Sequence, residues 1–164
     1  MKMQKLLPVM LLIAGCASNN GFSTADYIAV CPQVNIRHED RAIIQKVGAE
    51  DIFKIEVTGW KGRCYYDERV KKDKAVVAPE FKITRLSPTN IEDVHFSYYM
   101  ETAQGPERFL GKKTYFAKAE MLKDADEIYY TATENELAIP AGKYDFDMYI
   151  GLNAVKADSE YKLK

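Results

Sequence analysis

Two histidines stand close to carboxylates, and such groups are common metal ligands and general acids or bases. His38 is followed directly by Glu39 and Asp40, and His95 comes shortly after two acidic residues at positions 92 and 93. Neighbouring side chains of a strand point to opposite faces, so neither group can chelate an ion as a unit unless the chain turns there. A solvated loop at His38 and an exposed strand position at His95 explain both groups without a metal.

Three carboxylates gather at Asp124, Asp126 and Glu127. Carboxylate oxygens suit calcium, but the segment lacks the length and the glycine of an EF-hand loop. A solvated turn between strands is the simpler interpretation. The cluster nevertheless carries the alternative hypothesis of an ion- or ligand-binding protein.

Asp145 and Asp147 lie two residues apart, on one face of an expected strand. Paired carboxylates can hydrolyse glycosides when their separation is right, so a cell-wall hydrolase is a further alternative. Acids on the solvent face of a half-buried strand are equally ordinary. The chain has no nucleophile elbow, phosphate-binding loop, dinucleotide fingerprint or zinc-binding pattern, and we expect neither an enzyme nor a cofactor.

Tyrosine occurs eleven times, with doublets at 65–66, 98–99 and 129–130. In a strand one member of each doublet points inward and the other outward. Outward tyrosines offer contact area to a partner at low entropic cost, and the candidates are Tyr66, Tyr99 and Tyr130. The alternative is scattered surface tyrosine with no shared role.

The remaining chemical candidate is the thiol of Cys16. A short basic segment and an apolar run over residues 6–14 precede it, and the small residues Ala14 and Gly15 stand directly before it. A helix over that run reaches about 14 Å, far short of the roughly 30 Å of bilayer hydrocarbon. Residues 1–15 are therefore predicted to be a cleaved signal peptide.

Residues 13–16, Ile-Ala-Gly-Cys, resemble the lipobox of bacterial lipoproteins. The resemblance implies cleavage before Cys16, a diacylglycerol thioether on its sulfur and an acylated amino group. Three fatty chains such as palmitate would make attachment effectively permanent. Lipoproteins retained in the inner membrane often carry Asp after the cysteine, so Ala17 favours the periplasmic face of the outer membrane.

Cys31 and Cys64 remain as an even pair in an oxidising envelope, where a disulfide between them is expected. Two buried free thiols are the alternative. The 23 basic and 24 acidic residues are nearly balanced and form no long single-sign run, so nucleic acid is not an expected partner.

The chain after Cys16 divides into a small, polar, flexible tether at 16–26, one domain at 27–155 and a polar tail at 156–164. Residues 27–47 include either a short helix or an irregular strand. From residue 51 onward apolar and polar residues alternate, with a turn expected at 61–62, a break or edge at Pro79 and Trp60 assigned to the core.

About seven regularly spaced strands predict an all-β sandwich. Residues 139–146 resemble the turn into a late strand of immunoglobulin-like or fibronectin-type modules, which implies that topology. With 31–34, 62–67 and 140–152, the chain also resembles small uncharacterised envelope lipoproteins with a two-cysteine sandwich. We therefore expect a non-catalytic lipid-anchored protein that binds or braces another envelope component.

Overall fold

The computed structural model describes residues 31–104, 108–139 and 146–154. These contain nine strands and no helix: Gln33–Ile36 (β1), Ala42–Val47 (β2), Glu50–Asp67 (β3), Lys72–Arg85 (β4), Asp93–Gln104 (β5), Arg108–Glu120 (β6), Glu127–Thr131 (β7), Asn135–Ala138 (β8) and Asp147–Leu152 (β9). The all-β prediction is confirmed. The signal peptide, the tether, the tail and Asp145 lie outside the described residues.

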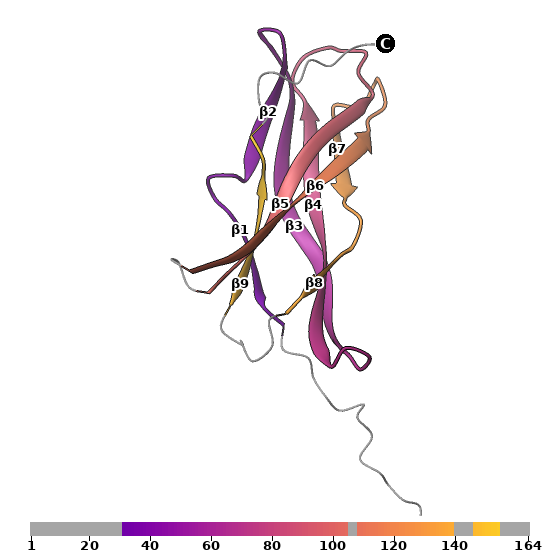
Figure 1. The fold of residues 1–164 in the computed structure, drawn as a ribbon. Helices are drawn as coiled ribbons and strands as arrows, with labels where there is room; N and C mark the ends of the chain where they lie inside the picture. The colour runs from indigo at the N-terminus through magenta and orange to yellow at the C-terminus, as the bar shows by residue number, and fades with distance from the viewer. Residues whose placement is uncertain (1–30, 105–107, 140–145, 155–164) are drawn as a thin grey trace, which may run out of the picture.

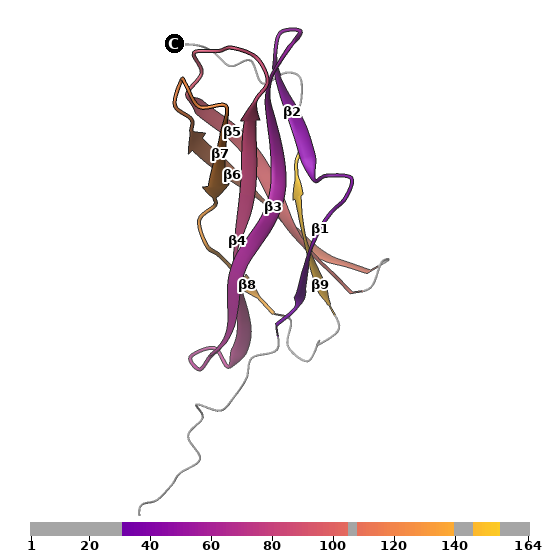
Figure 2. The ribbon, with the colours of Figure 1, turned by 180° about the vertical axis from the view of Figure 1, so that it is seen from behind.

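The strands form two packed sheets. One has the order β1-β9-β5-β6; the other has the order β2-β3-β4-β7, with β8 also paired to β4. Figure 1 shows the β5–β6 hairpin crossing the longer β3–β4 hairpin obliquely, and Figure 2 shows β2 on one side of β3–β4 and β7 on the other. The expected β-sandwich is thus present.

The strand order differs from that of an immunoglobulin domain. There the last two strands, F and G, lie in the same sheet. Here β8 pairs with β4, whereas β9 pairs in parallel with β1 and antiparallel with β5 in the other sheet. The two-sheet architecture is therefore shown, without the immunoglobulin pairing at its end.

The core lies between the two sheets, where the alternation predicted it. The inward side chains of β5 are buried, as are those of β9, and both sets meet the apolar face of β3 and β4. Phe81 on β4 is fully buried, with its ring centroid 4.9 Å from that of Phe96 and 5.2 Å from that of Tyr98. Aromatic contacts between the sheets therefore form the centre of the sandwich.

The β3–β4 hairpin corrects two expectations. No turn occurs at 61–62, because β3 continues to Asp67 and pairs with β4 along its length. A register shift near Gly59 does occur, and it leaves Trp60 40% exposed, so its assignment to the core was wrong. A side-chain carbon at Gly62 would lie 2.5 Å from the carbonyl oxygen of Val76, so glycine there permits close strand approach and does not mark a turn.

Pro79 lies inside β4, which is a central strand. The residues before it pair with β8 and those after it pair with β7, so the proline falls where one neighbour ends and the next begins. Its carbonyl accepts a hydrogen bond from the amide of Ala132, 2.9 Å away, in the link between those neighbours. The missing N–H of proline therefore costs no ladder hydrogen bond, and neither a break nor an edge is needed.

Of the region 27–47 that the pattern left open, the described residues 31–47 contain two strands, β1 and β2, and no helix. β2 pairs antiparallel with β3, with a register shift after Gln45. The side chain of Gln45 is buried, and its amide donates to the carbonyl of His95 on β5, 2.6 Å away. Because β9 has ended before this level of β5, a β2 side chain satisfies the carbonyl and links the sheets.

Candidate interaction surface

The acidic group at the β6–β7 connection is not arranged as a cation site. Asp124 and Asp126 are exposed, and the Glu127 carboxylate forms an ion pair with Lys82 at 2.7 Å. In the part of the chain that the structure describes, no group of three or more His, Cys, Asp or Glu could hold a metal ion.

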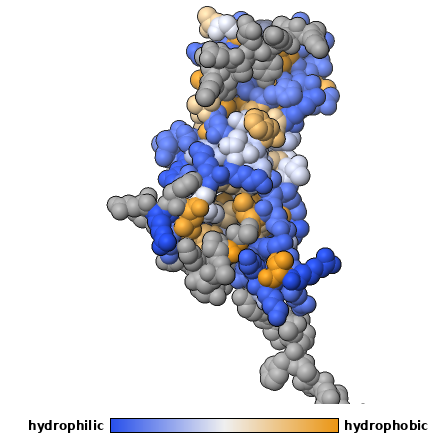
Figure 3. Space-filling model, in the orientation of Figure 1, coloured by the Kyte–Doolittle hydropathy of each residue, from blue (hydrophilic) through white to orange (hydrophobic). Residues whose placement is uncertain are grey.

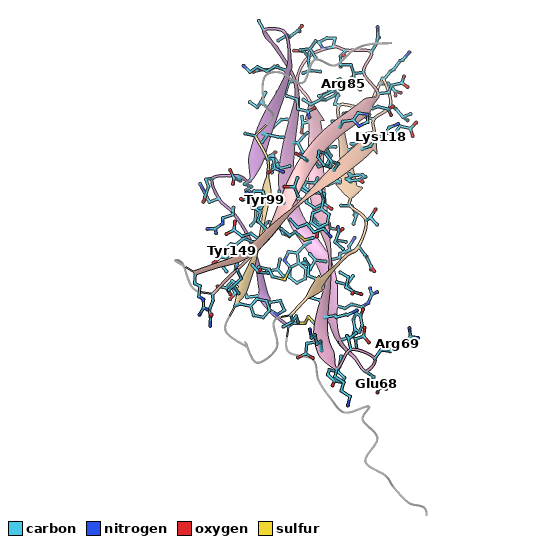
Figure 4. The ribbon with its side chains drawn as sticks, in the orientation of Figure 1. Glu68, Arg69, Arg85, Tyr99, Lys118 and Tyr149 are labelled. Atoms are coloured by element: carbon cyan, nitrogen blue, oxygen red, sulfur yellow. A yellow bond between two sulfur atoms is a disulfide. The ribbon has the colours of Figure 1, made fainter. Side chains whose placement is uncertain are left out.

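A half-buried arginine instead organises this end of the sandwich. The guanidinium of Arg85 donates to the carbonyls of Ala125 and Leu122, at 3.1 and 3.0 Å, and to that of Thr89 at 3.0 Å. One cation therefore joins two loops by charge-assisted hydrogen bonds. Figure 4 labels Arg85 at the upper end of the molecule, opposite the β3–β4 tip at Glu68 and Arg69.

The other sequence candidates for acid–base chemistry lie apart from each other. His38 is exposed in the β1–β2 connection, and His95 is exposed on β5. Asp147 accepts a hydrogen bond from the hydroxyl of Tyr149, 3.4 Å away, at the start of β9. Its expected partner Asp145 lies outside the described residues.

The tyrosine doublets point differently from the sequence prediction. Tyr130 packs against the core rings of Phe81 and Phe96, whereas Tyr129 is 71% exposed. Both members of the 98–99 doublet are buried, and Tyr66 is half-buried. The predicted outward position of Tyr130 was therefore wrong, because Tyr129 pairs with Lys82 on the outer face and Tyr130 with the core residue Phe81. Tyr99 does lie on the outer face of its sheet, but it is buried there.

Tyr99 is buried on the outer face of its sheet by its neighbours. Its hydroxyl donates to the Asp40 carboxylate, and the Lys112 ammonium lies 3.5 Å from its ring centroid. Beneath it is Gly151, where an added side-chain carbon would come within 2.5 Å of the phenol. The amide of Leu152 also donates to the carbonyl of Asp40, 2.8 Å away. These contacts fasten the β1–β2 connection to β5 and β9.

A second group lies beside Tyr99 on the same face. The guanidinium of Arg37 pairs with Glu101 at 2.6 Å and lies 4.0 Å from the ring centroid of Tyr149. Figure 4 labels Tyr99 and Tyr149 on this part of the molecule, on β5 and β9. The ionised groups here are matched to partners within the chain, and their role is to join β1, β5 and β9.

We expect the buried phenols to make the fold sensitive to alkali. Burial raises the pKa of Tyr98 to about 12, against a partly opposing hydrogen bond from Asn135. Burial and the bond to Asp40 also raise the pKa of Tyr99. The phenols keep their protons in the folded protein at pH values where they lose them in the unfolded chain. Their contribution to the free energy of unfolding is therefore fully present below about pH 10, the ordinary pKa of tyrosine, and is lost as the pH rises further.

For Tyr98 the loss should reach about 2–3 kcal/mol by pH 12. Urea unfolding between pH 8 and 12 measures it. Lysines also lose charge in this range, so Tyr98→Phe is the control, because it removes the phenol and leaves the lysines. An alkaline loss equal in the variant and the parent protein would contradict a contribution from this phenol.

The outward side chains of β6 form an exposed surface beside these contacts. β6 is the last strand of its sheet, and the side chains that alternate with its buried ones are exposed, namely Lys112, Thr114, Phe116, Lys118 and Glu120. Phe116 is 87% exposed, more than any other large apolar side chain of the described chain. We call these five residues the β6 outer row.

Sequence reasoning missed Phe116 and Tyr129 as surface residues. The signal was present for Phe116, because the alternation that predicts Ala117 and Ala119 as inward predicts Phe116 as outward. Figure 3 shows hydrophilic residues over most of the face that carries β5 and β6, with hydrophobic ones in small separate groups. An exposed phenylalanine on an edge strand is therefore the feature that most needs an explanation.

The disulfide expected from the sequence is present. Cys31 and Cys64 are bonded with their α-carbons 5.6 Å apart, which joins a position two residues before β1 to the interior of β3. No helix among the residues that the structure describes is long and apolar enough to span a membrane.

These features define an all-β sandwich with one disulfide, two open-edged sheets and a surface of paired charges. No protein-family model matches the chain, and neither the search of curated proteins nor that of solved structures found a match.

Proposed function

We propose that this protein is a non-catalytic lipoprotein, anchored through acylated Cys16 at the periplasmic face of the outer membrane, that binds or braces another component of the cell envelope. The proposal joins the lipobox-like residues 13–16 to a sandwich with an exposed apolar side chain on an edge strand. An anchored domain meets envelope partners at high effective concentration, so weak contacts suffice.

The observation that carries the proposal is the position of the disulfide, which joins the start of the described domain to β3. Cys31 is the first described residue after the tether, and its sulfur is bonded to Cys64, which lies opposite Ala75 of β4. β1, which follows Cys31, has four residues and pairs with β9 at the edge of its sheet. A force on the tether is therefore transmitted through the disulfide to the long β3–β4 ladder, and it does not separate β1 from β9.

That arrangement suits a protein that must stay folded while held at a membrane. A four-residue edge strand offers few hydrogen bonds against a pull along the chain, whereas β3 and β4 pair from Phe53–Arg85 to Asp67–Lys72. The disulfide thus protects the weakest strand at the point where the anchor acts. A freely diffusing domain would gain less from this placement.

The expected result for Cys16→Ser is release from the membrane. The thiol that would carry the lipid is lost, and cleavage at a lipobox depends on it. Cell fractionation and labelling with a palmitate analogue measure the change in the full chain. Cys31→Ser is the matched control, since it removes a cysteine but leaves the anchor, and should keep the label. Membrane retention and labelling of Cys16→Ser would contradict the anchor.

A photoreactive amino acid in place of Tyr129 tests the partner. Tyr129 is 71% exposed, on the outer face opposite that of β6. We expect an adduct with an envelope component in living cells, lost when Cys16→Ser is added. The same group at Glu68, at the β3–β4 tip, compares a second exposed position. Failure of both positions to yield any adduct would contradict a binding or bracing role.

A further inference from the structure

Two hydrogen bonds show to which side of β6 its backbone N–H and C=O groups point. The amide of Met121 donates to the carbonyl of Glu92, 2.7 Å away, so the backbone of residue 121 points toward the β5 side. The hydroxyl of Thr102 donates to the carbonyl of Gly111 at 3.5 Å, which gives the same direction for residue 111. Backbone groups alternate along a strand, and the β5–β6 register is regular between these residues.

The residues between them with the opposite direction are those of the β6 outer row. Their N–H and C=O groups therefore point to the side of β6 on which no strand of the described residues pairs. Five donors and five acceptors in one line form a template for another strand. The same residues carry the exposed side chains, so a strand added there would contact both the backbone and the side chains of the β6 outer row.

The order of charges along the row is complementary to itself when reversed. Lys112 and Glu120 stand four residues on either side of Phe116. An antiparallel partner of the same sequence, centred on Phe116, puts each Lys112 opposite a Glu120 and the two phenylalanines opposite each other. Aromatic and opposite-charge pairs directly across an antiparallel ladder are both favourable.

The contacts within the chain agree with this register. Lys118 already pairs with Asp93 at 2.7 Å, and the register puts it opposite the neutral Thr114. Lys112 lies over the ring of Tyr99 and is exposed, so its ammonium can also reach a carboxylate across the ladder. Sliding the partner so that the centre moves by one residue, to Tyr115, would set Lys112 against Lys118, and like charges directly opposite are unfavourable.

We propose that two copies of this protein pair edge to edge through β6, antiparallel and centred on Phe116, so that their four-stranded sheets join into one eight-stranded sheet. The pairing satisfies every open backbone group of the β6 outer row and covers the exposed phenylalanine. Edge pairing buries little area, so the dimer is weak in dilute solution and is favoured when both copies are held on one surface. Its strength in the cell therefore rests on the anchor proposed above, whereas its geometry does not.

Cysteine crosslinking tests the register. Residues opposite each other in a hydrogen-bonded pair have α-carbons about 5.5 Å apart, within disulfide range. Phe116→Cys should therefore form a disulfide-linked dimer by itself, both in cells and as the purified full chain under mild oxidation. Tyr129→Cys, also exposed but on the other sheet, is the matched control and should stay monomeric.

The ends of the row give a second readout. Two copies of Lys112→Cys would place their new thiols about 27 Å apart, as would two copies of Glu120→Cys, so neither single variant should crosslink. The double variant should, because positions 112 and 120 then face each other. Crosslinking of a single variant as readily as the double, or a Phe116→Cys adduct with a different protein, would overturn the proposal.

Charge reversal completes the test without any new cysteine. Lys112→Glu should weaken association of the full chain by roughly tenfold in analytical ultracentrifugation, and adding Glu120→Lys should restore it. No change in association for either variant would overturn the register. If Cys16→Ser remains in membranes while the double cysteine variant still crosslinks, the anchor is wrong and the edge pairing stands.

Discussion

Replacing either cysteine of the Cys31–Cys64 disulfide by serine should lower the free energy of unfolding by about 3–4 kcal/mol. The bond closes a loop with a sequence separation of 33 residues and so restricts the unfolded chain. It also holds the start of β1, a short edge strand, against the sandwich. Urea unfolding under oxidising conditions measures the change.

The two single variants should lose the same amount, and the double variant should lose no more than either. Both partners act through one bond, so their effects cannot add. Reduction of the parent protein should reproduce the loss, which separates the missing bond from any effect of the serine. Additive losses, or a reduced parent protein as stable as the oxidised one, would contradict a stabilising disulfide.

Replacing Phe81 by alanine should cost about 3–5 kcal/mol. Its side chain is fully buried, and its ring meets those of Phe96, Tyr98 and Tyr130 from the facing sheet and the adjacent strand. The cavity left by alanine would remove contacts between the two layers at their centre. Thermal or urea unfolding of the full chain gives the number.

Phe116→Ala is the matched control for this prediction. It makes the same chemical change on an edge strand where the side chain is 87% exposed. We expect a change within about 0.5 kcal/mol for the single chain. Equal destabilisation by both substitutions would mean that Phe81 is not at the centre of the packed core.

Phe116, unlike Phe81, lies on an edge strand, where the side chains affect association with other chains. Edge strands commonly carry lysines, which discourage association with other chains. β6 has lysines at 112, 113 and 118, yet its Phe116 is 87% exposed and the charges of its outer row match an antiparallel copy of themselves. The lysines therefore disfavour registers that set them opposite each other, such as the one centred on Tyr115, whereas the register centred on Phe116 sets Lys112 opposite Glu120.

The strands that alternate strictly could be predicted from the sequence. The inward residues of β5 and β9 are those that the period of two selected, because one face of each strand is buried and the other is solvated. The pairing of Cys31 with Cys64 was also predictable, since two cysteines remained once Cys16 was assigned to lipid. These features depend on composition and on local period alone.

The residues around 61–62 and Pro79 could not be interpreted locally. Lys-Gly has the composition of a turn, but here glycine allows a close approach to the Val76 carbonyl in a continuous strand. Proline is normally excluded from a central strand, but here it lies where β8 gives way to β7. In both cases the deciding contact comes from a different strand, which a local pattern does not contain.

The β6 outer row was likewise only partly predictable from the sequence. Alternation alone puts Phe116 outward on its strand, and the order of Lys112, Phe116 and Glu120 is readable along the chain. That β6 ends its sheet, and that Tyr99 is covered by Asp40 and Lys112, depends on which strands become neighbours. Side-chain direction is a local property of a strand, whereas exposure and open edges arise only when distant segments pack together.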